Sequence, residues 1–173
     1  MKEVLEKINN QLNLSINEMQ DAMNHIMSGK VNDNDIESFL IGLNTKGISQ
    51  EEITAAALIM KEKSLQIDIG GGSHIDTCGT GGTGLHIFNC STASSFVAAA
   101  GGAKITKHGN KAISSKSGSA DFLEEAGANI NHTRDKLNII FNEIGFVFLF
   151  APLHHQAMKY VMPVRKKIAA KTI

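Results

Sequence analysis

The sequence predicts an α/β protein with a small N-terminal helical domain, residues 1–68, and a larger domain built on a parallel sheet, residues 72–173. Apolar residues recur at helical spacing through the first part. Gly70-Gly-Gly-Ser73 is then typical of a hinge or linker. After it, short apolar strands alternate with helical segments, as in parallel sheets. A packing of the last helices, near residues 160–173, against the helical domain is compatible with this division.

Local capping signals place the helices of the first domain. Ser15 with Glu18, and Ser49 with Glu52, each form the spacing of a capping box, and Asn32 can cap a helix between them. The helix after Ser15 has an apolar stripe that we expect to be core, because methionine fills irregular gaps in helix packing. This stripe consists of Ile16, Met19, Met23, Ile26 and Met27.

The second domain is expected to alternate strands and helices. The expected order is a strand over 75–78, a helix capped by Ser91 or Thr92 and reaching Ala100, a strand over 103–106, a helix capped by Ser117 or Ser119, a helix opened by Thr133, a strand over 146–150 and a helix from about His155. The strand over 146–150 is continuously apolar, which indicates burial on both faces.

Composition excludes several classes of protein. The formal net charge is zero, so bulk electrostatics do not indicate a nucleic acid or membrane-surface partner. No apolar run approaches the length that spans a membrane, and the charged, amphipathic N-terminus is unlike a signal peptide. Cys78 and Cys90 match no zinc-ligand or redox-motif spacing. We therefore expect a reduced, cytoplasmic setting and no membrane partner.

The most informative segment is the glycine-rich run Gly79-Thr-Gly-Gly-Thr-Gly84. Glycines next to a helix start let backbone N–H groups approach an anion closely. No Asp or Glu occurs between Asp76 and Asp121, although this acid-free segment, residues 77–120, holds several lysines. These are Lys104, Lys107, Lys111 and Lys116. The pattern predicts a site for a strongly anionic ligand.

Two nucleotide-binding motifs and one structural explanation compete for this run. The spacing Gly79-x-Gly81-x-x-Gly84 matches the dinucleotide fingerprint, but that fingerprint also needs an acid about 20 residues on, and none precedes Asp121. A phosphate-binding P-loop is excluded because Leu85 stands where lysine is required. A plain turn between strand and helix is disfavoured by the missing acids and by two further polar loops. These loops are 107–115 and 116–121.

The three loops should meet, because ligand sites in parallel sheets lie at the carboxyl ends of the strands. Together they offer hydroxyls, amides and lysines without carboxylates. A phosphorylated sugar or a diphosphate needs this set of donors.

The motifs together resemble those of the anthranilate phosphoribosyltransferases over essentially the whole chain. They are Asp76-x-x-Gly79-Thr-Gly-Gly82, Phe88-Asn-x-Ser91-Thr92, Lys107-His-Gly-Asn110, Ser114-Ser-Lys-Ser-Gly-Ser-Ala-Asp121 and Pro163-Val-Arg165. Pyrimidine nucleoside phosphorylases share the fold with a looser version of the loops. The resemblance implies transfer of the phosphoribosyl group of phosphoribosyl diphosphate (PRPP) to the amine of anthranilate in tryptophan biosynthesis, with Mg²⁺, usually by a homodimer.

The resemblance also implies roles for individual residues. The PRPP-binding residues would be Gly79, Gly82, Thr83, Ile87, Asn89, Cys90, Ser91, Thr92, Lys107, His108, Gly109, Asn110, Lys111, Ser114, Ser115 and Ser119. Gly79, Asn110 and Arg165 would hold anthranilate, and the Ser91 hydroxyl would be a magnesium ligand. The reaction passes through an oxocarbenium-like centre as diphosphate leaves, so positioning and charge stabilisation matter most. No side chain is nominated as a catalytic general base.

The chain departs from the family pattern in three respects. Thr83 stands where the family usually has Asp, and Ile87 where it usually has Thr. The family also ordinarily continues beyond Ile173 into more sheet and a magnesium-holding Asp-Glu pair, so we expect this chain to be a fragment that is inactive alone. Two other functions remain open at this point: a nucleoside phosphorylase, and a non-catalytic relative that binds nucleic acid. The formal net charge of zero counts against nucleic-acid binding.

Overall fold

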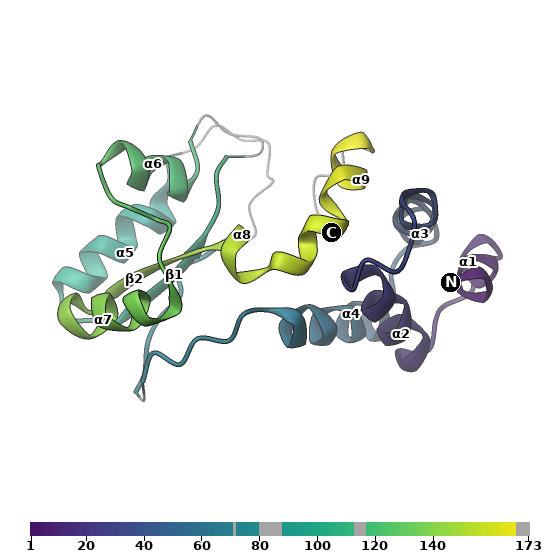
Figure 1. Cartoon of the computed structure of the whole chain (residues 1–173), viewed down its shortest axis with the longest axis horizontal. Coiled ribbons are helices and arrows are strands. Elements are labelled where there is room, and N and C mark those ends of the chain that lie inside the picture. The colour runs from purple at the N-terminus through teal and green to yellow at the C-terminus, as the bar shows by residue number, and fades with distance from the viewer. Residues whose placement is uncertain (71, 80–87, 113–116, 169–173) are drawn as a thin grey trace. The chain divides into compact units, whose positions relative to one another are not determined.

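The computed structural model describes residues 1–70, 72–79, 88–112 and 117–168. The chain divides into two compact units. Unit 1 consists of Met1–Ser64 with His155–Ile173, and unit 2 consists of Leu65–His154. The two units correspond to a helical part and an α/β part, and each is described by itself (Figure 1).

Unit 1 is helical. Its elements are α1 (Lys2–Asn9), α2 (Ile16–Met27), α3 (Asp33–Lys46), α4 (Gln50–Lys63), the 3₁₀ helix η1 (Gln156–Tyr160) and α9 (Met162–Lys167). Helix α2 packs against α4, α1 packs against α3, and the C-terminal elements pack on α2 and α3. The core between them includes most of the expected apolar stripe, namely Met19, Met23, Ile26 and Met27. Ile16 was wrongly placed in this core: it is 49% exposed at the first residue of α2.

The start of each long helix in unit 1 follows from its capping residue. Ser15 and Ser49 form the two predicted capping boxes, and Asn32 caps α3 through its contact with the Asp35 amide. These caps satisfy backbone N–H groups that a helix start otherwise leaves without partners. The predicted starts of α2, α3 and α4 are therefore confirmed.

Unit 2 contains α5 (Cys90–Ala100), β1 (Ile105–Gly109), α6 (Ser119–Glu125), α7 (Arg134–Ile144), β2 (Phe146–Phe150) and α8 (Ala151–His154). Strands β1 and β2 are parallel, with Ile105 opposite Phe146 and Gly109 opposite Phe150. Ile75 adds a parallel bridge to Ile105. This confirms the α/β class with a parallel sheet.

Neighbouring residues of β2 pack against different helices of unit 2. The reason is that successive residues of a strand face opposite sides of the sheet. Val147 of β2 packs with Ile69, Leu137 and Phe141, which include the inner face of α7. Its neighbour Phe148 packs instead with a second group that includes residues of α6. This second group is Ala120, Leu123 and Ile130. Strand β2 is thus apolar on both faces, as its sequence predicted.

Several boundaries in unit 2 differ from the sequence predictions. Helix α5 is capped by Asn89 rather than by Ser91 or Thr92, and α6 begins at Ser119 after Gly118 rather than after a hydroxyl cap. Strand β1 extends to Gly109, because its pairing with β2 continues through Lys107 and His108. Of the expected strand over 75–78, Ile75 forms a single bridge. In unit 1, the single helix expected from about His155 is replaced by η1 and α9.

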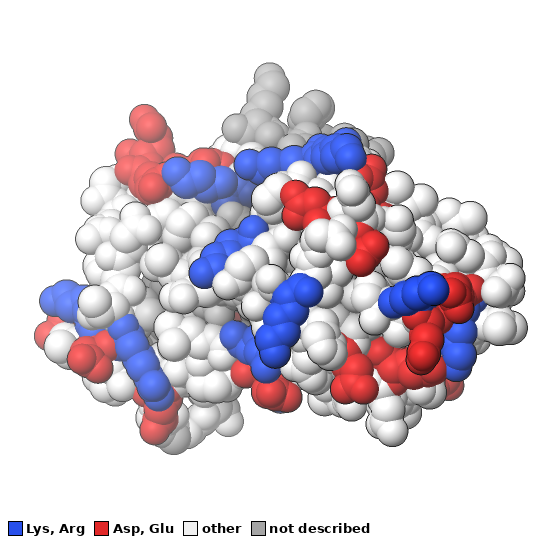
Figure 2. Space-filling view, turned by 45° about the vertical axis from the view of Figure 1, so that its right-hand side comes forward, with Lys and Arg blue, Asp and Glu red and all other residues white. Residues whose placement is uncertain are grey.

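The described residues include no helix long and apolar enough to cross a membrane. On the face drawn in Figure 2, Lys and Arg side chains lie among Asp and Glu side chains and do not gather into one patch of a single sign. This mixture agrees with the formal net charge of zero.

Candidate anion-binding site at the strand ends

The predicted binding segments of unit 2 meet where β1 and the chain after Ile75 leave the sheet. Ile75 and Ile105 run parallel, with Ile75 N donating to Lys104 O at 2.9 Å and Thr106 N donating to Ile75 O at 2.9 Å. Carboxyl ends of parallel strands lie at the same edge of a sheet. The residues after Ile75 and those at the end of β1 therefore share one edge.

A chain of hydrogen bonds joins three segments at this edge. Lys107 Nζ donates to Thr77 Oγ1 at 3.3 Å, and Thr77 Oγ1 donates to the Ser91 carbonyl at 2.8 Å. Lys107 belongs to β1, Thr77 to the approach to the glycine-rich run, and Ser91 to the first turn of α5. The predicted PRPP residues Lys107 and Ser91 are therefore brought together through Thr77, for which the sequence indicated no role.

Lys107 is a cation in a buried position, with a residue exposure of 1%. Burial lowers the pKa of Lys107, while the neighbouring Cys78 and the Asp76 carboxylate act to raise it. A buried ammonium needs compensating charge, because removal from water disfavours the charged form. An anionic ligand at this edge would supply such charge.

The start of α5 presents a second part of the site. Asn89 Oδ1 accepts from Thr92 N at 3.1 Å and from Ser91 Oγ at 3.2 Å. Thr92 is 2% exposed, and its hydroxyl has no hydrogen-bond partner among the described residues. A buried hydroxyl without a partner is uncommon in a folded protein. Because the N-terminus of a helix attracts anions, this hydroxyl is well placed to donate to one.

The loop after β1 returns to the same region. Asp121 Oδ2 accepts from Ala112 N and from Gly118 N, both at 2.8 Å, and Ala120 N donates to the Asn110 carbonyl at 3.2 Å. These amide hydrogen bonds lower the pKa of Asp121. The Asp121 carboxylate thus holds Ala112 and Gly118, and the Ala120 amide keeps Asn110 close to the start of α6.

Glycines allow this loop to pack closely. A Cβ at Gly118 would lie 2.6 Å from both Ala112 N and Asn110 O. A Cβ at Gly109 would overlap the Ser119 hydroxyl and lie 2.7 Å from the Phe148 ring. The glycines of Lys-His-Gly-Asn and Ser-Gly-Ser are therefore needed for the close approach of β1 to α6.

Lys111 differs from Lys107 in its surroundings. Its ammonium is exposed and pairs with Glu124 at 2.8 Å, which raises the pKa of Lys111. Exposed pairs of this kind contribute little stability, so separating Lys111 from Glu124 costs little.

The remaining predicted residues fall into two groups. Gly82, Thr83, Ile87, Ser114 and Ser115 lie outside the described residues. Arg165 belongs to unit 1 and lies in α9, where its Nη1 contacts Met162 Sδ at 3.9 Å and burial lowers the pKa of the guanidinium. Its predicted contact with anthranilate stays a prediction. So does the ligand role of each site residue in unit 2.

Sequence reasoning missed two residues of this edge as site components. Thr77 links Lys107 to α5, and Asp76 accepts two backbone amides. The sequence could have indicated a role for Asp76, because this acid directly precedes the acid-free segment. No sequence feature indicated a role for Thr77, since a threonine in a short strand is common.

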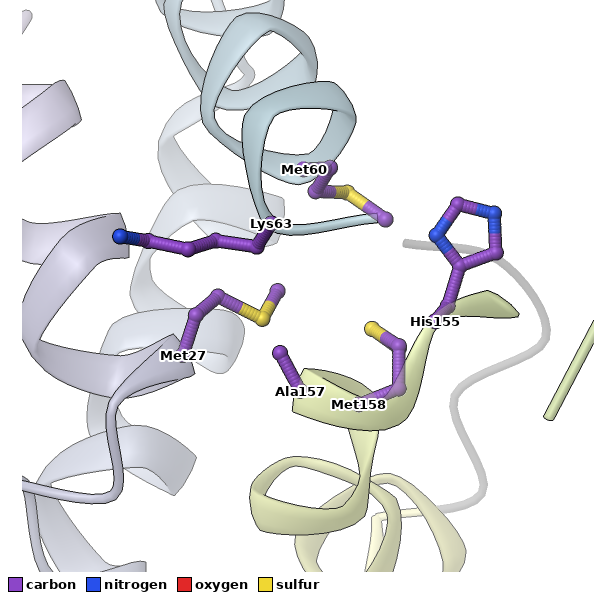
Figure 3. Close-up of a pocket in the computed structure, with 6 residues that line it drawn as sticks. All are labelled: Met27, Met60, Lys63, His155, Ala157 and Met158. Atoms are coloured by element: carbon purple, nitrogen blue, oxygen red, sulfur yellow. The ribbon is translucent and has the colours of Figure 1, made fainter. Parts of the chain in front are cut away.

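A pocket in unit 1 provides a contrast. It has a volume of about 10 Å³, close to the space that one water needs. Figure 3 shows the Met27, Met60 and Met158 side chains around it, with the Lys63 side chain running away. His155 and Ala157 complete the lining. The pocket is too small for a sugar diphosphate and is a packing gap between helices.

Comparison with known proteins agrees with this arrangement. Residues 2–64 match the helical bundle domain of a glycosyl transferase family, and residues 71–173 match the a/b domain of the same family. The helical part and the α/β part of the fold thus correspond to the two domains of this family. The chain belongs to this glycosyl transferase family.

Relatives within the family are anthranilate phosphoribosyltransferases, which confirms the resemblance. The chain is 47% identical to the enzyme named so from Vesicomyosocius okutanii and 49% identical to that from Ruthia magnifica, covering 100% of this chain and 51% of each relative. The chain thus spans about half the length of the curated relatives it matches.

Solved structures show the same relationship. The anthranilate phosphoribosyltransferase of Thermus thermophilus has a TM-score of 0.82 and 34% identity, covering 98% of this chain and 51% of that one. The Saccharomyces cerevisiae enzyme in complex with PRPP and Mg has a TM-score of 0.86 and 29% identity, covering 99% of this chain and 52% of that one.

Proposed function

We propose that the protein binds PRPP for the transfer of its phosphoribosyl group to the amine of anthranilate, which gives N-(5-phosphoribosyl)anthranilate and diphosphate in tryptophan biosynthesis. The observation that supports this best is the edge formed by Lys107, Thr77 and the start of α5. There the buried Lys107 side chain is linked through Thr77 to the start of α5, where the buried Thr92 hydroxyl has no described partner. The relatives named as this enzyme support the choice of reaction.

The chain's own residues would act on the leaving diphosphate. Lys107 and the N-terminus of α5 stabilise the negative charge that grows as the bond from the anomeric carbon to diphosphate breaks. Asn110 and Gly79 of unit 2 would hold anthranilate so that its amine meets that carbon. Arg165 suits the anthranilate carboxylate because of its planar fork of donors. The chemistry then depends on positioning more than on proton transfer.

Magnesium is the expected cofactor. The Ser91 hydroxyl oxygen, which contacts Asn89 Oδ1, is a hard ligand of the type that Mg²⁺ accepts. The described residues contain no group of three or more His, Cys, Asp or Glu that could hold a metal ion. Phosphate oxygens of PRPP would therefore supply much of the coordination, as is common for Mg²⁺. When bound, the ion neutralises part of the diphosphate charge.

We further propose that the protein is a cytoplasmic homodimer. A groove of about 430 Å³ between α1 and α3 is the surface that we propose for self-association; Ile8, Ile41 and Gly42 line it with five polar residues, and Ile41 is 48% exposed. Measurement of molar mass by light scattering tests this, and a mass of 18.6 kDa at micromolar concentration would contradict it.

Isothermal titration of the chain with PRPP and Mg²⁺ tests the proposed function. We expect saturable binding that is lost in Lys107→Met, which keeps the length of the side chain and removes its charge. The matched control is Lys136→Met, an exposed lysine of α7 in the same unit. Absence of PRPP binding, with binding of a nucleoside and phosphate, would favour a phosphorylase. Absence of PRPP binding, with salt-dependent binding of single-stranded DNA, would favour a nucleic-acid-binding relative.

A further inference from the structure

Asp76 lies at the edge where an anion is expected, and its carboxylate is engaged by the backbone. Its Oδ1 accepts from Cys78 N at 2.8 Å and from His108 N at 3.2 Å. Cys78 leads directly into Gly79 and the glycine-rich run, whereas His108 belongs to the Lys107–Asn110 segment at the end of β1. One oxygen atom thus joins two segments that are both expected to bind PRPP.

The position of this contact follows from the sheet. Ile75 bonds to Lys104 and Thr106 in the regular parallel pattern. Continued by two residues, that pattern would give the His108 amide the Thr77 carbonyl as its acceptor. The Asp76 side chain takes this amide instead. The main chain after Thr77 can then leave the sheet, while the His108 amide at the end of β1 still has a hydrogen-bond acceptor.

The charge of Asp76 makes its location informative. A carboxylate close to a diphosphate repels it, and the acid-free segment begins directly after this residue. Asp121, the acid at the other border of that segment, is used in the same way, by accepting two amides of the next loop. Both bordering acids therefore direct their charge at backbone N–H groups, which bind a carboxylate strongly.

We propose that Asp76 is a positioning residue of the PRPP site, which acts by tying Cys78, the residue that leads into Gly79, to the Lys107–Asn110 segment. This inference rests on the proposed function, because it assumes that these two segments hold PRPP. The role requires an acceptor oxygen at this position, and it requires no negative charge.

Variants of Asp76 separate the tie from the charge. Asp76→Asn keeps an acceptor oxygen at the same place and removes the charge. Asp76→Ala removes both, and Asp76→Glu keeps the charge but moves the oxygens by one methylene. If only the charge mattered, Asn and Ala would both bind PRPP more tightly than the unaltered chain. If Asp76 acts by holding the two segments together, we expect a different order of PRPP affinities among the variants.

The experiment is titration of each variant with PRPP and Mg²⁺, with amide hydrogen exchange at Cys78 and His108 followed in parallel. We expect Asp76→Ala to bind about tenfold or more weakly, because two backbone amides lose their acceptor. Asp76→Asn should bind more tightly than Asp76→Ala, and Asp76→Glu more weakly than Asn. Protection of the two amides should fall in Ala and persist in Asn. Asp135→Ala, which removes an exposed acid of the same unit, should leave binding unchanged.

The results that overturn the inference are equally definite. Binding by Asp76→Ala as tight as that of the unaltered chain would do so. If Asp76→Ala does not fold, the other two variants decide, and Glu binding as tightly as Asn would overturn it. Failure of the unaltered chain to bind PRPP would count against the proposed function instead. The exchange rates of Cys78 and His108 would then still show whether Asp76 makes the tie.

Discussion

Lys107 Nζ donates a hydrogen bond to Thr77 Oγ1 at 3.3 Å, and that hydroxyl in turn donates to the Ser91 carbonyl. A threonine hydroxyl here does two tasks, because it accepts from a buried ammonium and satisfies a carbonyl in the first turn of α5. The direction of the Lys107 side chain is therefore coupled to the position of the helix start. The affinity of any ligand that contacts both Lys107 and the start of α5 will therefore depend on this coupling.

Replacing Thr77 by valine tests the coupling. Valine has nearly the same shape but no hydroxyl, so the Lys107 ammonium and the Ser91 carbonyl each lose a partner. Leaving buried polar groups without partners costs about 1–3 kcal/mol, and we expect a loss of unfolding free energy in this range. PRPP affinity should fall as well, because Lys107 is no longer directed towards the start of α5. Urea unfolding and calorimetric titration measure the two effects.

The matched control is Thr77→Ser, which restores the hydroxyl and removes one methyl group. It should recover most of the PRPP affinity. Equal stability and equal affinity for the valine variant and the unaltered chain would show that the hydrogen bonds seen here contribute nothing.

Gly118→Ala should destabilise unit 2 through a steric overlap. The backbone at Gly118 has φ of −92°, which any residue adopts, so conformational strain is not the cause. The overlap is with backbone atoms, since a Cβ would lie 2.6 Å from Ala112 N and Asn110 O. Backbone cannot move aside as a flexible side chain does, and such overpacking typically costs about 1–3 kcal/mol. Thermal unfolding measured by circular dichroism checks this.

Gly79→Ala is the informative comparison for Gly118. No described atom lies within 4 Å of a Cβ at Gly79, so its melting temperature should stay unchanged. PRPP affinity should nevertheless fall, because the resemblance places this glycine against the ligand. If Gly79→Ala melted much earlier than Gly118→Ala, the described packing of both loops would be wrong.

The accuracy of the sequence predictions depended on how local the determining contacts were. Ser15, Ser49 and Asn32 were predicted as caps, because a cap and its amide lie within one turn. The cap of α5 was missed, since Asn89 had been given to the ligand and the hydroxyls of Ser91 and Thr92 are equally good caps by sequence alone.

Contacts between distant residues account for the other differences. Lys107 lies in a buried strand because β1 pairs with β2 about forty residues later along the chain, and loop-like Lys-His-Gly gives no sign of that pairing. Asp76 reaches His108 over a separation of 32 residues. The motifs were thus recognisable from sequence, whereas the contacts that hold them together required the fold.

The buried ion pair of unit 1 gives a prediction of pH dependence. Lys46 Nζ and Glu52 Oε2 lie 2.7 Å apart, with side-chain exposures of 2% and 0%. Glu52 also accepts from Leu14 N and Ser49 N, both at 2.8 Å. Burial by itself raises the pKa of Glu52, but the hydrogen bonds from Lys46 and the two amides outweigh it, so the pKa lies below the ordinary value.

The sign of the effect follows from this lowered pKa. A carboxyl with a lower pKa in the folded state contributes stability above its unfolded pKa, near 4.3, and loses it as the pH falls through the folded value. Unfolding free energy from Glu52 should therefore be constant from about pH 7 to pH 5 and decline below about pH 4. Glu52→Gln should remove this part of the acid dependence. Urea titrations at a series of pH values measure it.

Lys46→Met tests the pair itself. It leaves the Glu52 charge buried with only two amides, and breaking a buried pair typically costs about 3–5 kcal/mol. Because the lost partner no longer lowers the pKa of Glu52, the variant should also lose less stability than the unaltered chain on acidification. The control is Lys7→Met, which breaks the more exposed pair with Glu18 and should barely change the melting temperature. Equal losses for Lys46→Met and Lys7→Met would mean that Lys46 and Glu52 do not form a buried pair in solution.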